Sequence, residues 1–190
     1  SHVVDPASEE FSADLDFFAS VCRTVRGLRS ARIGAIGTRP AAFQTVRYSE
    51  KILQRTGITV LPVDLSEIFA AAESIGDREE ALLNKVNEIL AYGTVPASIS
   101  PAKVLRQAKL SLAVERWQTD NGCDASAIQC WNSLEKNYGC ASCLTMSMVS
   151  ESLKPSACEV DVTGALSMYA LTLATQRPAA LLDWNNNYGD

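Results

Sequence analysis

The sequence predicts an α/β fold in which an open, mostly parallel sheet carries helices on both faces. Two observations predict it. Short apolar runs alternate with helix-patterned segments along the whole chain, which is the pattern of parallel strands joined by right-handed helical crossovers. The apolar runs are also nearly continuous rather than alternately polar, as strands covered on both faces require. The expected architecture is therefore doubly wound, of the flavodoxin-like or Rossmann-like kind.

The first elements follow from spacing and from turn residues. Residues 11–28 have apolar side chains at helical spacing and predict an amphipathic helix, which Ser12 could cap. The run ARIGAIG at 31–37 predicts the first strand, which stops at Gly37. Pro40 then marks a turn, because proline fixes one backbone torsion and removes a hydrogen-bond donor.

The next segments continue the alternation. Residues 43–57 predict a helix that ends at Gly57, since glycine is common just after helix ends. The run ITVLPVD at 58–64 predicts the second strand. Two helices are then expected at 65–76 and 77–93, the second begun by Asp77 and ended by Gly93.

The second half of the chain is expected to add three strands. A helix should run from Pro101, a favoured first helical residue, to about Thr119. The strands are expected in DASAIQCW, SACEVD and PAALLDW, at 124–131, 156–161 and 178–184, with helices at 143–153 and 162–176 on either side of the second of these.

Composition limits the class of protein. A chain of 190 residues with 47% hydrophobic and 21% charged residues suits one globular domain. We expect residues 1–8 to be a flexible tail or an expression remnant and 9–190 to be a single α/β domain. No apolar run approaches the ~20 residues that span a bilayer, and the start does not resemble a signal peptide. A cytoplasmic protein without a membrane partner is therefore expected.

The charge and the cysteine content argue against nucleic-acid-binding and zinc-binding proteins. The net charge is −5 and the 17 Lys and Arg residues are scattered, which argues against a nucleic-acid partner. Cys130 and Cys158 lie in apolar runs and are interpreted as small buried hydrophobes. Cys140 and Cys143 have CxxC spacing, but zinc would require a second pair or two histidines, and His2 is the only histidine. A helix start is favoured there over zinc or redox chemistry.

Two carboxylates follow expected strands. Glu159 closes the fourth strand and Asp183 the fifth, and one helical crossover separates them. Ligands of open parallel sheets bind at the carboxyl ends of the strands. Two carboxylates close together repel, so one must take up a proton or a divalent cation must hold both. The structural alternative is helix capping, which explains Asp161 well and Glu159 poorly, because Glu is a weak cap.

Other polar side chains are expected at the same edge of the sheet. Arg39 follows the first strand, and Gln129 and Trp131 follow the third; Trp184 and Asn185 follow the fifth. Amides and an indole ring are a common lining for a sugar, since amides both donate and accept hydrogen bonds. A solvated loop is the alternative for the asparagines at 185–187. No GxGxxG, P-loop or GxSxG motif is present.

Three segments resemble the central domain of the L-fucose isomerase family: RIGAIGTRPAAFQTVRYSEKIL, ACEVDVTGALSMYALTLA and RPAALLDWNNNYGD. The resemblance covers 31–190. It implies a metal-dependent aldose–ketose isomerase, normally with Mn²⁺ or another divalent cation, acting on a small-molecule sugar. Glu159 and Asp183 would be the metal ligands and would move the proton between C1 and C2. Gln129 and Trp131 match a segment near the family's sugar pocket, and Arg39 matches a motif without an assigned role.

The resemblance also implies what is absent. The family's third protein ligand is a histidine from a C-terminal domain, and an N-terminal domain precedes the central one. We therefore expect this chain to be a piece of a longer protein that assembles as a homo-oligomer. The isolated piece is expected to be inactive as an isomerase, or nearly so. The alternatives are a non-catalytic sugar-binding or regulatory module of the same fold and, on architecture alone, a flavodoxin-like cofactor domain.

Overall fold

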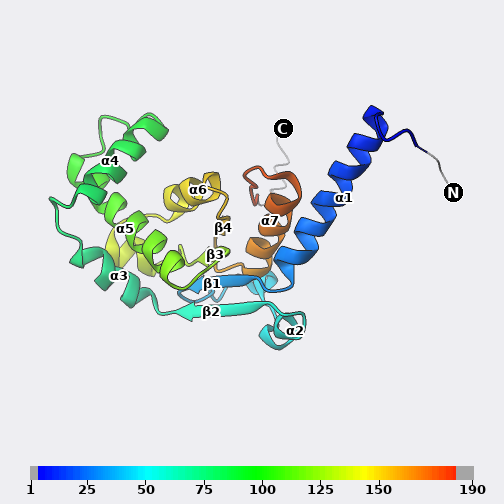
Figure 1. Cartoon of the computed structure of the whole chain (residues 1–190). Helices are drawn as coiled ribbons and strands as arrows, with labels where there is room; N and C mark the ends of the chain where they lie inside the picture. Colours follow the sequence, from blue (N-terminus) through cyan, green and yellow to red (C-terminus); the bar gives the residue numbers. More distant parts are fainter. Residues whose placement is uncertain (1–3, 183–190) are drawn as a thin grey trace, which may run out of the picture.

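Four short parallel strands form the sheet in the described part of the chain (Figure 1). The computed structural model describes residues 4–182. The strand order is β2-β1-β3-β4, and all three pairings are parallel. The bounds are β1 Arg32–Ile36, β2 Thr59–Val63, β3 Ala125–Ile128 and β4 Ser156–Ala157. The predicted open α/β fold is confirmed, and the strand order reverses between β1 and β3, where such sheets bind ligands.

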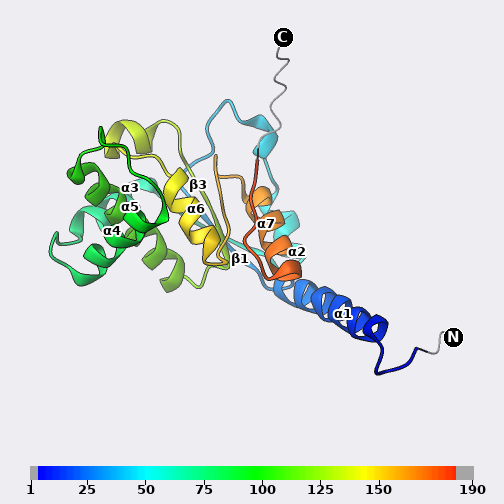
Figure 2. The ribbon, with the colours of Figure 1, turned by 90° about the horizontal axis from the view of Figure 1, so that it is seen from above.

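Helices pack on both faces of this sheet (Figures 1 and 2). One face is covered by α2 (Glu50–Arg55) and α7 (Val162–Thr175), which bury side chains such as Ile33 and Ala127. The other face is covered by α3 (Leu65–Ser74), α5 (Pro101–Asp120) and α6 (Cys143–Glu151), and α4 (Glu80–Tyr92) packs against α5. Burying each large aliphatic side chain of this core stabilises the fold by about 1.5–3 kcal/mol.

The register explains how the two faces are sorted. Ile33 pairs with Val60 on one side and with Ala125 on the other, and these apolar side chains share the face of α7. Ser126 pairs with Ser156 and lies on the opposite face, where its hydroxyl contacts the Ser156 hydroxyl at 2.8 Å. β2 lies at the edge of the sheet, which allows a proline within it.

The first helix differs from the prediction at its start. α1 (Glu9–Leu28) is capped by Ser8, whose hydroxyl accepts the Phe11 N–H, and Ser12 is inside the helix. The expected boundary at Ser12 was wrong because Glu9 and Glu10 favour the positive end of the helix dipole. α1 projects from the body (Figure 2). Its Arg23 guanidinium donates to the carbonyl of Leu173 at 2.6 Å, near the end of α7.

Two expected helices begin elsewhere or are interrupted. The predicted helix at 43–57 is instead a short 3₁₀ turn, η1 (Gln44–Val46), followed by α2. Arg47 and Ser49 have extended backbone torsions, which end the 3₁₀ turn and delay the helix to Glu50. The Arg39 guanidinium donates to the Phe43 carbonyl at 2.9 Å just before this turn. Asp77 does not cap α4, because it forms an ion pair with Lys109 at 2.6 Å.

The remaining expectations are settled as far as residue 182. Pro101 begins α5, Gly93 follows α4 and the Asp161 carboxylate caps α7 by accepting the Gly164 N–H, as predicted. The predicted fifth strand is wrong for 178–182, which form no strand; its other two residues lie outside the described residues. This segment packs back against α7 through Leu181, whose side chain contacts Gly164. One further helical turn, η2 (Leu134–Tyr138), lies between β3 and α6.

The described helices, within 4–182, include none that combines the length and the apolar run required to cross a bilayer.

Gly57 gives a test of this packing. Its φ is +91°, and a Cβ there would overlap the carbonyl oxygen of Arg29. We expect Gly57→Ala to lower the free energy of unfolding by about 2 kcal/mol or more, from the backbone conformation and the clash together. Urea denaturation measures the effect. The control is Gly93→Ala, because Gly93 has an extended φ of −168° and open space around it; equal stability of the two variants would contradict the packing.

Candidate functional site

The candidate site lies where β3 and β4 end. Ala127 of β3 pairs with Ala157 of β4, so residues a short way beyond these pairs emerge at the same edge of the sheet. Cys130 follows β3, and Cys158 and Glu159 follow β4. The parallel register therefore brings together side chains that are 29 residues apart in the sequence.

The backbone at Glu159 makes a sharp turn from β4 into α7. Glu159 and Val160 have φ values of 54° and 55°, in the left-handed region. This conformation costs about 1–2 kcal/mol for a residue with a Cβ, and for β-branched Val160 it is unusual. The Val160 N–H donates to the carbonyl of Ile128 at 3.3 Å, which ties the turn to the end of β3. Strain of this kind is common at functional sites.

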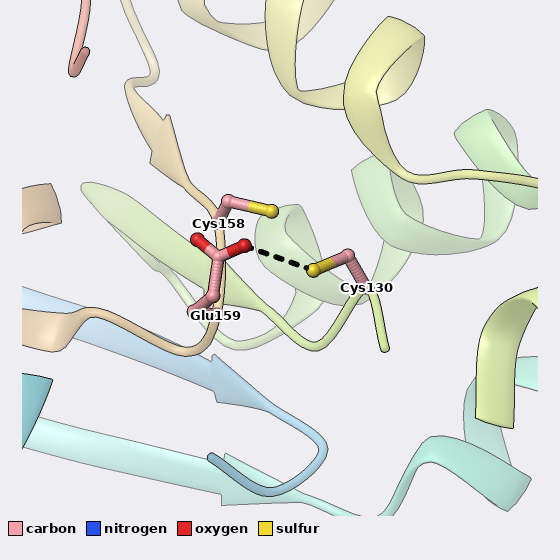
Figure 3. A group of neighbouring side chains, drawn as sticks. All are labelled: Cys130, Cys158 and Glu159. Atoms are coloured by element: carbon pink, nitrogen blue, oxygen red, sulfur yellow. Dashed lines mark hydrogen bonds between the residues drawn. The ribbon is translucent and has the colours of Figure 1, made fainter. Parts of the chain in front are cut away.

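The turn directs the Glu159 carboxylate toward the end of β3 (Figure 3). The Cys130 thiol donates to Glu159 Oε1 at 3.2 Å. The Sγ atom of Cys158 completes a group in which one ligand atom from each of the three residues lies within 4.8 Å of the others. Cys130 is buried, and Cys158 and Glu159 are half-buried. The described residues thus contain a group that could hold a metal ion.

Burial governs the protonation of the two thiols. It is the largest cause that raises the pKa of Cys130 and of Cys158 above the usual value. At Cys158, hydrogen bonding with Cys130 and Glu159 raises the pKa in the same direction. Both thiols are therefore neutral at neutral pH, which matches the role of Cys130 as a hydrogen-bond donor to the carboxylate.

The carboxylate is accessible from a cavity. Cys158 and Glu159 line a cavity of about 300 Å³ together with residues of α6, α7 and the segment that follows α7. Leu181, two residues before Asp183, is part of that lining. The cavity is large enough for water molecules or a small ligand to reach Glu159.

Gln129 connects the loops that follow β1 and β3. Its Oε1 accepts the Thr38 N–H at 2.8 Å, and its Nε2 donates to the Trp131 carbonyl at 2.9 Å. The Trp131 ring is 47% exposed and meets the Phe43 ring edge-on, with 4.9 Å between ring centres. The Gln129 amide is thus engaged in holding the loops, while the indole offers an open face.

Arg39 also stabilises its own loop. Its Nη1 donates to the carbonyls of Pro40 at 3.0 Å and Phe43 at 2.9 Å. A cavity of about 270 Å³ lies beside it, lined also by Arg47, Tyr48 and Val160. Glu159 therefore lines the first cavity, and Val160, the next residue of the same turn, lines this second cavity.

The predicted site residues are brought together only in part. Arg39, Gln129, Trp131 and Glu159 all follow strands at the carboxyl edge of the sheet, as expected from the sequence. The other predicted site residues, Asp183, Trp184 and Asn185, lie outside the described residues.

Sequence reasoning missed the two cysteines beside Glu159. Both were interpreted as small buried hydrophobes, and the structure places them in contact with a half-buried carboxylate. The signal in the sequence was that each follows a strand at the edge already assigned to ligands. The interpretation of the CxxC pair agrees with the structure, where Cys143 begins α6.

The sequence is similar to part of several curated sugar isomerases. The curated sulfoquinovose isomerase of Alkalicoccus urumqiensis is 34% identical over 152 residues, which are 80% of this chain and 34% of the relative. That of Clostridium sp. (strain MSTE9) is 30% identical over 176 residues, 91% of this chain and 38% of the relative. That of Priestia aryabhattai is 26% identical over 153 residues.

The chain is distantly homologous to part of these isomerases. It spans about a third of the length of the curated relatives it matches. No family model matches the chain. The expected class, a domain of an aldose–ketose isomerase, is supported at this coarse level.

The donor set shows which ions the described residues fit. Mn²⁺ prefers oxygen ligands, whereas thiol sulfur is a soft donor that suits Zn²⁺ and similar ions. Among the described residues, the group at Glu159 supplies one carboxylate and two thiols. These residues alone do not fit Mn²⁺, which would require further oxygen or nitrogen ligands from outside 4–182.

Gln129 provides a test of the loop geometry. Gln129→Ala removes the hydrogen bond that joins the β1 loop to the β3 loop and a second one within the β3 loop, so we expect a loss of about 1 kcal/mol of stability and faster amide exchange at Thr38. Hydrogen exchange followed by NMR measures this. The control is Gln54→Ala, an exposed position in α2. Unchanged exchange at Thr38 would show that the amide does not hold the loop.

Proposed function

We propose that this chain is the central domain of a longer aldose–ketose isomerase and that Glu159 is its acid–base carboxylate. The observation that carries the proposal is the position of Glu159, half-buried at the carboxyl edge of a parallel sheet and open to a cavity of about 300 Å³. The homology to part of several sulfoquinovose isomerases supports the same reaction class.

The proposed reaction moves a proton between C1 and C2 of an aldose. The Glu159 carboxylate takes the proton from C2 and returns it to C1 through an ene-diol. The Cys130 thiol donates to Glu159 Oε1 and so orients the carboxylate. Asp183 is proposed as the partner carboxylate.

The proposed cofactor is Mn²⁺ or another divalent cation, with Glu159 and Asp183 as two of its ligands. Bound there, such an ion would act as a Lewis acid toward the sugar. The remaining ligands are proposed to come from other domains of the same protein, which we expect to assemble as a homo-oligomer. Trp131, with Trp184 and Asn185, is proposed to line the sugar site.

The substrate is proposed to be L-fucose or a related aldose, and the second cavity favours aldoses that carry an anionic group. Sulfoquinovose, after which the relatives are named, carries a sulfonate. Arg39 and Arg47 line the cavity beside Val160, and neither forms an ion pair within residues 4–182. Arginine forms strong charge-assisted hydrogen bonds with such anions.

The carboxylate can be tested by substitution in the full-length protein. With Mn²⁺ present and L-fucose, D-arabinose or sulfoquinovose as substrate, Glu159→Gln should lower kcat by about 10²–10⁴-fold, because an amide cannot exchange a proton. The matched control is Glu151→Gln, an exposed position at the end of α6. Full activity of Glu159→Gln would refute the assignment. A wild-type protein that binds the sugar without isomerising it would favour the non-catalytic module instead.

The anionic substrate class can be tested at Arg47. We expect Arg47→Gln to raise KM for sulfoquinovose by about 10–100-fold, the effect of one charged hydrogen bond, and to leave KM for L-fucose unchanged. Steady-state kinetics of both substrates measure the difference. Arg55→Gln is the control, because Arg55 is an exposed residue of α2. An equal change for both sugars would exclude an anion-specific role.

A further inference from the structure

The two thiols beside Glu159 have no role in the proposed isomerase reaction other than the orienting hydrogen bond from Cys130. Three side chains of the kinds that bind Zn²⁺ nevertheless converge there: two thiols and one carboxylate. They follow two neighbouring strands, and the strand pairing and the left-handed turn at Glu159 hold them in place.

The distances suit a small tetrahedral ion. Zinc lies about 2.3 Å from sulfur and about 2.0–2.2 Å from carboxylate oxygen, so its ligand atoms lie roughly 3.5–3.8 Å apart. In this group, Cys130 Sγ and Glu159 Oε1 are 3.2 Å apart, and one ligand atom from each residue lies within 4.8 Å of the others. Adjustments of about 1 Å or less would complete the geometry.

The surroundings also suit an ion with three protein ligands. Such zinc sites have a fourth position open to water or to a small ligand. Cys158 and Glu159 line the cavity of about 300 Å³, which provides that space. Cys130 is buried, which keeps competing solvent away from its sulfur.

We propose that Cys130, Cys158 and Glu159 form a binding site for a thiophilic divalent cation of the Zn²⁺ class. Binding exchanges the two thiol protons, which leave to solvent, for two metal–sulfur bonds, and Glu159 supplies the third bond. Thiolate ligands select this class of ion over Mn²⁺.

The site has a regulatory consequence, which rests on the proposed function. A Glu159 carboxylate bound beside Cys130 and Cys158 to a thiophilic cation is no longer available to the Mn²⁺ and the sugar of the proposed reaction. Occupancy of the cysteine site therefore inhibits the reaction, and removal of the thiophilic cation by a chelator, followed by resupply of Mn²⁺, restores it. The binding itself does not depend on the proposed function.

The binding test uses Cd²⁺ as the probe on the 190-residue chain, with Cys22, Cys140 and Cys143 replaced by alanine and a thiol-free reductant present. We expect one Cd²⁺ per chain and an ultraviolet thiolate-to-cadmium charge-transfer band. Cys130→Ser and Cys158→Ser should each remove about half of the band and weaken binding at least about tenfold. Glu159→Gln should weaken binding while the band is retained. Cys123→Ala, a buried cysteine outside the group, is the control.

Several outcomes would refute the proposed cation site. Absence of the band in the parent variant, with native circular dichroism, would refute it, and so would a band unchanged by both serine substitutions. If a serine variant fails to fold, the number of Cd²⁺ ions bound per parent chain and the Cd²⁺ titration of Glu159→Gln still test the proposal. In the full-length enzyme, Zn²⁺ should inhibit and Cys158→Ser should relieve the inhibition. A full-length protein without isomerase activity would refute the proposed function and leave the cadmium result intact.

Discussion

The parallel pairing of β3 with β4 is the constraint on which the candidate site depends. Only two residue pairs are involved, Ser126 with Ser156 and Ala127 with Ala157. The serine hydroxyls contact each other at 2.8 Å in the interior, and the Gln118 amide of α5 donates to Ser126. Because the strands are parallel, this short ladder fixes where Glu159 lies relative to the end of β3, and the buried hydroxyl contacts resist a shift in register.

The same strand pairing places Glu159 where either sulfur or oxygen ligands could share a metal ion with it. Its sulfur neighbours are Cys130 and Cys158, which follow β3 and β4. The oxygen neighbours that an isomerase would require are proposed to come from Asp183 and from other domains. Hard and soft ions differ in the donors that they prefer, so the donors that join Glu159 would determine both the ion and the chemistry.

The sequence was sufficient for features that local physics determines. Continuous apolar runs predicted the positions of β1 to β4, and Pro101 and Asp161 marked helix starts correctly. Other features depend on contacts that the local pattern does not contain. The Arg39 guanidinium donates to the Phe43 carbonyl in a segment expected to be helical, and Lys109 forms an ion pair with the carboxylate expected to cap α4. Cys130 was missed because its proximity to Glu159 depends on strand pairing, which the local pattern around either residue does not contain.

The central claim is that Glu159 is a metal-binding carboxylate at the edge of the sheet. A crystal structure of the full-length protein grown with Mn²⁺, with anomalous data collected at the manganese edge, tests it most directly. The account predicts an anomalous peak about 2.0–2.3 Å from a Glu159 carboxylate oxygen, in the range typical of hard divalent ions. A manganese peak bound by other residues, with Glu159 directed away from it, would contradict the account.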